Sequence, residues 1–283
     1  MAEPLGRAET RELLERHGIR LRRDLGQHFL VEPNVVRRIV EIAGVGPESK
    51  VVEIGAGAGT LTRSLAATGA KVIAYEIDES LQPVLAETVG DVVDLRFGDA
   101  ADVDFDAVLP TGEWIVVANL PYNVGTPIVL TMLRSVPRIT RLVVMLQREA
   151  VDRLVAEPGS RVFGLPSVIV RLNGTVRTAL RVPAHVFFPE PKVESSVAVI
   201  DRTDADPAAE AAIHLAGVGF GQRRKMLRSS LRGVATGEAL VAAGIDPTLR
   251  AENLAPDDWL RLAEVVSSPG GGSTPKGGGG RQS

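Results

Sequence analysis

The sequence predicts an α/β fold built on a mostly parallel, doubly wound sheet, followed by a smaller helical domain. Three observations support this prediction. Short runs of Val, Ile and Leu recur between residues 50 and 201 and alternate with segments of helical spacing, as in strands joined by crossover helices. The runs are almost continuously apolar, as expected for strands that are buried on both faces. Residues 208–265 have helical spacing only.

The expected elements follow one another in a simple order. Helices are predicted near residues 8–17 and 33–43, before a strand at residues 50–55 that enters a glycine-rich loop. Further strands are expected at residues 71–76, 92–97, 114–118, 141–146, 167–172 and 196–201. Intervening helices are expected at residues 60–67, 79–89 and 148–156.

These elements divide the chain into three parts. Residues 1–203 are expected to form the sheet domain with an N-terminal helical extension, and residues 204–266 the helical domain. The polar stretch DRTDADP, at residues 201–207, marks the boundary between them. Residues 267–283 are Gly-rich and of low complexity, so we expect a disordered tail.

The composition excludes several functional classes. The 283 residues are 45% hydrophobic and 24% charged with a net charge of −3, which is typical of a globular protein. The absence of cysteine excludes disulfides, cysteine-ligated metal sites and a cysteine nucleophile, and we expect no bound metal. The chain contains no apolar run of about 18 residues, and its N-terminus lacks an apolar signal region. We therefore expect a cytoplasmic protein with no membrane partner.

A glycine-rich loop follows the first strand of the predicted sheet. Gly55, Gly57 and Gly59 lie in EIGAGAGTLT, where glycines let backbone N–H groups approach a ligand at a helix N-terminus. A dinucleotide-binding fingerprint would need glycine at position 60, which is Thr60. This difference disfavours a dinucleotide oxidoreductase. The G-x-G-x-G spacing resembles motif I of S-adenosylmethionine-dependent methyltransferases.

Two carboxylates follow the next two strands. Glu76 ends the strand at residues 71–76 and can accept hydrogen bonds from both ribose hydroxyls of an adenosine ligand. Asp99 lies just past the strand at residues 92–97 and can accept from the exocyclic amine of an adenine. Ligands of open α/β sheets bind along the carboxyl ends of the strands, so we expect both residues at one adenosine site.

The most specific segment is Asn119-Leu120-Pro121-Tyr122, directly after the strand at residues 114–118. It resembles motif IV of methyltransferases that act on exocyclic amino groups. Because the lone pair of an adenine N6 is delocalised into the ring, N6 is a poor nucleophile. The side-chain oxygen of Asn119 and the Leu120 carbonyl can hold the N6 hydrogens out of the ring plane and aim the lone pair at a methyl group. Tyr122 offers an aromatic face to an extruded base.

Three further segments extend the resemblance: GQHFL at residues 26–30, FFPEPKVES at 187–195 and GQRRKMLR at 221–228. With N-L-P-Y, they occur in the same order as in the KsgA-type small-subunit ribosomal RNA adenine dimethyltransferases, and the resemblance covers about residues 20–265. It implies a Rossmann-like class I methyltransferase domain with a small helical, rRNA-binding C-terminal domain. It further implies S-adenosylmethionine as cofactor. The expected reaction is N6,N6-dimethylation of two adjacent adenines in the hairpin loop near the 3′ end of 16S rRNA.

The same resemblance implies that the protein acts on small ribosomal subunits or their precursors during biogenesis, and we expect a monomer. It also implies a set of cofactor-binding residues, which together with Gly57 of the glycine loop are His28, Leu30, Gly55, Glu76, Asp99 and Asn119. Many family members have Asn where this chain has His28. Phe187 and Phe188 cannot both face inward on a strand, so one of them is a candidate to stack on the flipped base opposite Tyr122, and the sequence leaves both open.

A basic cluster in the helical domain is expected to contact rRNA phosphates. It consists of Arg223, Arg224, Lys225, Arg228 and Arg232. On a helix, Arg224, Arg228 and Arg232 would share one face.

Two alternative functions stay open at this point. One is a large-subunit rRNA adenine methyltransferase of the macrolide-resistance type, which shares the glycine motif and N-L-P-Y. The other is a non-catalytic ribosome-assembly or transcription factor. The FFPEPKVES and GQRRKMLR segments favour the small-subunit type, and the intact N-L-P-Y and Glu76 favour catalysis.

Overall fold

The computed structural model describes residues 3–22 and 25–268, which belong to two compact units. The first unit spans Met1–Val155 and Asn173–Asp204, and the second spans Ala156–Leu172 and Ala205–Ser283. The sequence analysis assigns residues 156–172 to the sheet domain. They belong instead to the second unit, where the ring of Phe163 packs edge-on against Phe220. Most of the expected Gly-rich tail, residues 269–283, lies outside the described residues.

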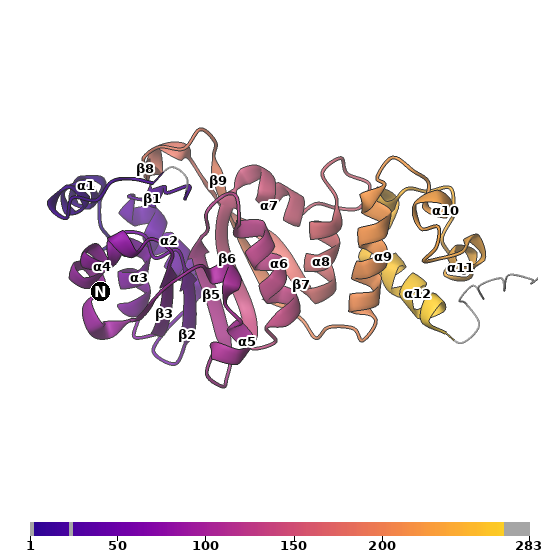
Figure 1. The fold of residues 1–283 in the computed structure, drawn as a ribbon, viewed down its shortest axis with the longest axis horizontal. Coiled ribbons are helices and arrows are strands. Elements are labelled where there is room, and N and C mark those ends of the chain that lie inside the picture. The colour runs from indigo at the N-terminus through magenta and orange to yellow at the C-terminus, as the bar shows by residue number, and fades with distance from the viewer. Residues whose placement is uncertain (1–2, 23–24, 269–283) are drawn as a thin grey trace, which may run out of the picture. The chain divides into compact units, whose positions relative to one another are not determined.

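A seven-stranded sheet with the order β4-β3-β2-β5-β6-β9-β7 forms the centre of the first unit (Figure 1). Neighbouring strands from β4 to β6 are parallel, and β9 is antiparallel to both of its neighbours, β6 and β7. This mostly parallel sheet confirms the predicted fold class. Its strands are β2 (Lys50–Ile54), β3 (Lys71–Glu76), β4 (Asp94–Phe97), β5 (Trp114–Asn119), β6 (Ile139–Gln147), β7 (Gly174–Val182) and β9 (Ser195–Arg202).

Within the seven-stranded sheet, one predicted strand is wrong and one observed strand was not predicted. Residues 167–172 belong to helix α8 (Leu165–Asn173), and the strand follows directly as β7. A short apolar run fits a buried helix as well as a buried strand, so periodicity alone cannot separate them. β7 lies at the edge of the sheet with exposed side chains such as Arg177 and Arg181, and therefore lacks the continuous apolar run of the inner strands.

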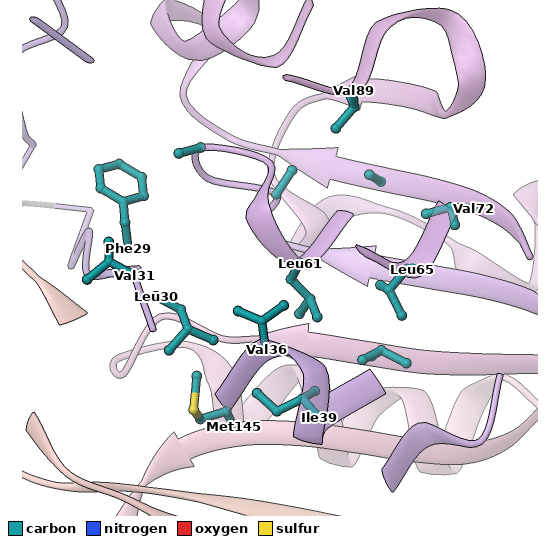
Figure 2. Close-up of a cluster of buried hydrophobic side chains, with 14 of the residues drawn as sticks. Phe29, Leu30, Val31, Val36, Ile39, Leu61, Leu65, Val72, Val89 and Met145 are labelled. Atoms are coloured by element: carbon teal, nitrogen blue, oxygen red, sulfur yellow. The ribbon is translucent and has the colours of Figure 1, made fainter. Parts of the chain in front are cut away.

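One face of the sheet is covered by α2 (Pro33–Ala43), α3 (Thr60–Ala66) and α4 (Gln82–Val89). Helix α2 begins at a proline, and the Glu32 side chain accepts a hydrogen bond from the N–H of Asn34 at its start. Figure 2 shows the apolar cluster beneath these helices, in which Val36 and Leu61 lie close to Met145 of the sheet. This core fixes where the loop between β2 and α3 sits above the strand ends.

The other face of the sheet is covered by α5 (Phe105–Val108) and α6 (Gly125–Ser135). The ring of Phe105 packs edge-on against Tyr75, with ring centroids 5.2 Å apart. Helix α6 begins at Gly125, where an added Cβ would lie 2.3 Å from a methyl group of Leu146. Glycine at this position thus lets α6 start close to the sheet, directly after the N-L-P-Y segment. The first unit also contains α7 (Arg148–Leu154).

A second, two-stranded sheet joins distant parts of the first unit. β1 (Phe29–Leu30) pairs antiparallel with β8 (Phe187–Phe188), with Phe29 opposite Phe188 and Leu30 opposite Phe187. This pairing brings GQHFL beside FFPEPKVES. Before β1 comes α1 (Arg7–Arg16). The described part of the chain also has short 3-10 helices at Glu79–Leu81, Gly90–Val92, Ala100–Asp102, Ala184–Val186 and Ala251–Asn253.

The second unit is helical, with α8, α9 (Ala209–Gly221), α10 (Leu227–Ser230), α11 (Gly237–Ala242) and α12 (Pro256–Ser267). Its core contains the fully buried Trp259, whose ring lies 6.3 Å from that of Phe220. At Gly219 an added Cβ would lie 2.8 Å from the Trp259 ring, so a larger residue there would push α9 and α12 apart. Neither unit has, within its described residues, a helix of the length and apolarity needed to span a membrane.

Candidate active site

A pocket lies at the carboxyl ends of β2, β3 and β5. Its walls come from residues 25–30, the glycine loop, the end of β3 and residues 119–122. Nine of the residues singled out from the sequence line it, and they are His28, Leu30, Gly55, Gly57, Glu76, Asn119, Leu120, Pro121 and Tyr122. The structure thus brings together most of the expected cofactor site and the whole N-L-P-Y segment.

Strand register explains why these residues meet. Val51 pairs with Val72 and with Ile115, and side chains alternate between the two faces along each strand. The side chains of Glu76 and Asn119 therefore project from the face of the sheet that α2 and α3 cover. Each residue stands at the carboxyl end of its strand. Glu53 projects from this face as well, one step below the glycine loop.

The glycine loop holds the carboxylate of Glu76. The N–H of Gly57 donates to Glu76 Oε2 at 2.8 Å, and the N–H of Asp78 donates to Oε1 at 2.9 Å. Gly57 has a φ of +57°, and an added Cβ would lie 3.0 Å from the ring of Phe29. Burial raises the pKa of Glu76, while the two N–H groups oppose the rise. A carboxylate in this position can accept further hydrogen bonds from hydroxyl groups in the pocket.

Glu53 is a second buried carboxyl group in the pocket wall. Its residue is 1% exposed, and its Oε2 atom has no hydrogen-bond partner among the described residues. Burial raises the pKa of Glu53 to about 8; the side chain of Thr62 opposes this rise, and the nearby carboxylate of Glu76 adds to it. A buried polar oxygen without a partner destabilises the protein, and a ligand in the pocket that supplies a hydrogen-bond donor would satisfy it.

Asn119 is oriented by its neighbour across the pocket. Its Nδ2 donates to the backbone carbonyl of His28 at 3.2 Å. Since a carbonyl can only accept, the amide nitrogen must face His28, and the side-chain oxygen is left to accept from a ligand. Leu120 buries its side chain, with 1% exposed, and therefore offers only its backbone to the pocket.

An aromatic pair closes one side of the pocket. The His28 and Tyr122 rings stack with centroids 5.6 Å apart and planes 25° apart. His28 Nδ1 lies 2.7 Å from the carbonyl of Pro189, and because a carbonyl can only accept, Nδ1 carries the proton of this hydrogen bond. The Tyr122 hydroxyl lies 2.9 Å from that of Ser195. These contacts hold both rings, and His28 stacks on only one face of the Tyr122 ring.

Three predicted residues lie outside the pocket lining. Asp99 is exposed at the same sheet edge, and its Oδ1 accepts from the N–H of Ala101 at 2.8 Å. Phe187 is fully buried in the core, whereas Phe188 is only partly buried and pairs with Phe29. Of the two phenylalanines that the sequence left open, Phe188 is the one with accessible surface.

The basic cluster does not form the helical face expected from its spacing. Helix α9 ends at Gly221, and the next helix, α10, is only four residues long. The N–H of the buried Leu227 donates to the carbonyl of Leu249 at 2.7 Å and not to a carbonyl four residues earlier, so the segment does not continue as one helix. Arg224, Arg228 and Arg232 therefore lie on a turn, a short helix and a second turn.

Arg223 differs from the rest of this cluster. Its guanidinium donates to Glu252 at 2.8 Å and to the carbonyl of Arg161 at 2.6 Å. It thus ties together segments of the second unit. All five members of the cluster are exposed.

Comparison with known proteins identifies the family. The model of the family described as ribosomal RNA adenine dimethylase matches residues 18–268. The chain belongs to the ribosomal RNA adenine dimethylase family. This dimethylase uses S-adenosylmethionine as its cofactor, and the family confirms the predicted enzymatic activity.

Two curated relatives of this dimethylase carry the name ribosomal RNA small subunit methyltransferase A. The one from Phenylobacterium zucineum is 42% identical over 261 residues, which cover 90% of this chain and 91% of the relative. The one from Nocardia farcinica is 43% identical over 276 residues, which cover 92% and 94%. Both alignments span almost the whole dimethylase, including both of its units.

Solved structures share the fold of the dimethylase. A dimethyladenosine transferase from Plasmodium falciparum has a TM-score of 0.69 at 23% identity, covering 83% of this chain and 96% of that one. The 23S rRNA methyltransferase ErmE has a TM-score of 0.66 at 25% identity, covering 85% and 100%. The large-subunit alternative shares the fold but is not favoured, because the small-subunit relatives are much more similar in sequence.

Three residues that line the pocket have no role in it predicted from the sequence. Glu53 carried a signal, since it is a lone charge within the otherwise apolar end of a buried strand. Gln27 donates to Asp78 at 2.6 Å and links the GQHFL segment to the turn after Glu76. Thr60 served only to exclude a dinucleotide site, yet its hydroxyl accepts a hydrogen bond from the N–H of Leu5 at 2.8 Å. No local sequence pattern reveals these last two contacts.

Proposed function

We propose that this dimethylase transfers methyl groups to N6 of two adjacent adenines in the hairpin loop near the 3′ end of 16S rRNA, acting on small ribosomal subunits or their precursors during biogenesis. The observation that carries the proposal is the orientation of Asn119, whose amide nitrogen is engaged by His28 and whose oxygen is free to accept from an exocyclic amine. The names of the relatives support the small-subunit substrate.

The pocket fits S-adenosylmethionine by the chemistry of its walls. Glu76 would accept from the ribose hydroxyls, and Asp99 would bind the adenine from the same sheet edge. Leu30, Gly55 and Gly57 would line the cofactor closely. The unpartnered oxygen of Glu53 suits the positively charged methionine end, and the His28 side chain lies in the wall of the same pocket. Bound S-adenosylmethionine supplies an electrophilic methyl group.

The chain's own residues would prepare the target base. Asn119 and the Leu120 carbonyl accept the N6 hydrogens and hold them out of the ring plane, so the lone pair is localised on N6. Pro121 fixes the turn that presents Tyr122, and Tyr122 and Phe188 stack on the flipped base from two sides. Phe187 supports Phe188 from the core. No residue is needed as a general base, because N6 can lose its proton to water after transfer.

The substrate can be tested directly. Purified protein with labelled S-adenosylmethionine should label small subunits from a strain that lacks this gene, and should not label fully methylated wild-type subunits. Mass spectrometry should then place four methyl groups on the two adjacent adenines. Equal labelling of large-subunit rRNA would instead support the macrolide-resistance type, and cofactor binding without any labelling would support a non-catalytic factor.

Glu53 leads to a prediction about pH. With a pKa of about 8, this group is mostly protonated at pH 7 in the free protein. A bound cation stabilises the carboxylate and lowers its pKa, so S-adenosylmethionine binding should release a proton and strengthen as pH rises from 6 to 8. Calorimetry at pH 7 in buffers of different ionisation enthalpy measures this release. Glu53→Gln should reduce the release and flatten the pH dependence, whereas Glu79→Gln, an exposed control, should change neither.

The basic cluster is proposed to bind rRNA phosphates. Reversing two exposed charges, Arg224→Glu with Arg228→Glu, should weaken binding to small subunits while leaving S-adenosylmethionine affinity unchanged. Counterion release makes phosphate contacts strongest at low salt, so the affinity gap between variant and wild type should be widest there and narrow as salt rises. Filter binding across a salt series measures it. A charge-matched control, Arg38→Glu with Lys71→Glu, should lose much less.

The remaining parts of the proposal concern the protein in the cell. We expect the methyltransferase chemistry in the first unit and rRNA binding in the second. We also expect a cytoplasmic monomer that needs no metal and no membrane. Sedimentation of the purified protein at micromolar concentration tests the monomer, and full activity in the presence of a chelator tests the independence from metal.

A further inference from the structure

Helix α1 lies before the residues matched by the family model, yet it is tied to the active-site unit at three points. Just ahead of it, the N–H of Leu5 donates to Thr60, directly after the glycine loop. At its start, Arg7 donates to backbone carbonyls near β8. At its end, Arg16 and His17 pair with Glu87 of α4. The helix therefore forms a strap across the elements that build the pocket.

Arg7 makes the contact nearest to the chemistry. A single nitrogen, Nη2, donates to the carbonyl of His185 and, at 2.9 Å, to that of Phe187. The carbonyl between them, that of Val186, accepts from the N–H of Val31 at 2.9 Å on the other side. The segment that leads into β8 is thus held from both sides, by Arg7 and by the backbone that follows β1.

This segment sets the position of two walls of the site. Phe188, the candidate to stack on the target base, follows directly after Phe187. One residue further on, the carbonyl of Pro189 binds His28, which stacks on Tyr122. Small displacements of groups around a reacting centre can lower a rate by about a hundredfold, so the contacts that fix β8 matter for the reaction as well as for the fold.

We propose that Arg7 is a positioning residue, which acts through β8 to hold Phe188 and His28 in register with the N-L-P-Y segment. The inference rests on the proposed function for its effect on methylation. Its effect on the order of the β1–β8 wall does not depend on that function. Because both bonds come from one nitrogen, a lysine ammonium, which has three donors, can replace the guanidinium in part.

The test compares three variants of the full chain. Arg7→Ala removes the contact and Arg7→Lys restores part of it. Arg11→Ala is the matched control, because Arg11 lies on the same helix and, among the residues that the structure describes, forms an ion pair only with the exposed Glu15. Two quantities are measured for each: amide hydrogen exchange in peptides covering residues 27–31 and 184–190, and the single-turnover methylation rate at saturating S-adenosylmethionine and saturating unmethylated small subunits.

For Arg7→Ala we expect exchange in both peptides to accelerate and the methylation rate to fall roughly tenfold, which corresponds to about 1.4 kcal/mol. Affinity for the subunits should change little. Arg7→Lys should recover most of both losses, and Arg11→Ala should match wild type. Unchanged exchange, or faster exchange with a wild-type rate, would overturn the proposal. If the wild-type protein fails to methylate small subunits, the proposed function is wrong, while the exchange data still decide whether Arg7 orders this wall.

Discussion

Replacing Asn119 with alanine is expected to lower single-turnover methylation of unmethylated small subunits by roughly a hundredfold or more, as when one preorganised polar group is removed from a reaction centre. The His28 carbonyl fixes the amide so that its oxygen is presented to the pocket. An acceptor that acts mainly in the transition state affects the rate far more than ground-state binding. Affinity for the subunits should therefore stay close to wild type, with a modest loss of S-adenosylmethionine affinity.

The control for this variant is Asn34→Ala, which removes an exposed asparagine at the start of α2 and should leave the rate unchanged. Filter binding, calorimetry and single-turnover kinetics separate the three quantities. A wild-type rate for Asn119→Ala would mean that the N-L-P-Y segment is only a turn. If affinity for the small subunits fell by the same factor as the methylation rate, Asn119 would act only in binding the RNA substrate.

Replacing Glu76 with alanine is expected to weaken S-adenosylmethionine binding at least tenfold, since hydrogen bonds to a charged group contribute about 1.5–3 kcal/mol. The change removes the acceptor for the ribose and also leaves the N–H groups of Gly57 and Asp78 without their partner. Calorimetric titration measures the loss, and circular dichroism checks the fold.

Two further variants keep this second prediction testable if alanine disturbs the glycine loop. Glu76→Gln preserves the shape of the side chain but removes its charge and one acceptor, and should give an intermediate loss. Glu79→Ala, at an exposed position three residues on, should bind the cofactor as wild type does. Equal affinity for all three variants and wild type would remove Glu76 from the site.

The sequence predicts the position of a pocket residue well wherever that residue stands at the end of a predicted strand. Glu76 and Asn119 end β3 and β5, the two apolar strands on either side of β2, so a parallel sheet brings both to one edge, as the structure shows. Glu53 was within reach of the same reasoning, because a carboxylate in a buried strand needs an explanation. The spacing of the strands and the glycine loop thus carry most of the cofactor pocket.

The errors arise where tertiary contacts override local pattern. The apolar run at residues 167–172 fits a strand as well as a helix, and only its packing in the second unit selects the helix. Arg224 and Arg228 have helical spacing, but α9 ends at Gly221 before either residue, and only Arg228 lies in a helix, the short α10. Choosing between Phe187 and Phe188 needs the pairing of β8 with β1, and no local signal specifies a partner so far away in sequence.

The pairing of Phe29 with Phe188 also has a consequence for how the enzyme is made. The segment that forms one wall of the pocket leaves the ribosome early, but its partner strand is synthesised about 160 residues later. At 5–20 residues per second this delay is on the order of ten seconds or more, during which the N-terminal wall has nothing to pair with. The nascent chain can therefore build most of its sheet while its pocket is still open. This wall of the pocket can close only after β8 has been made, when about two thirds of the chain has been synthesised.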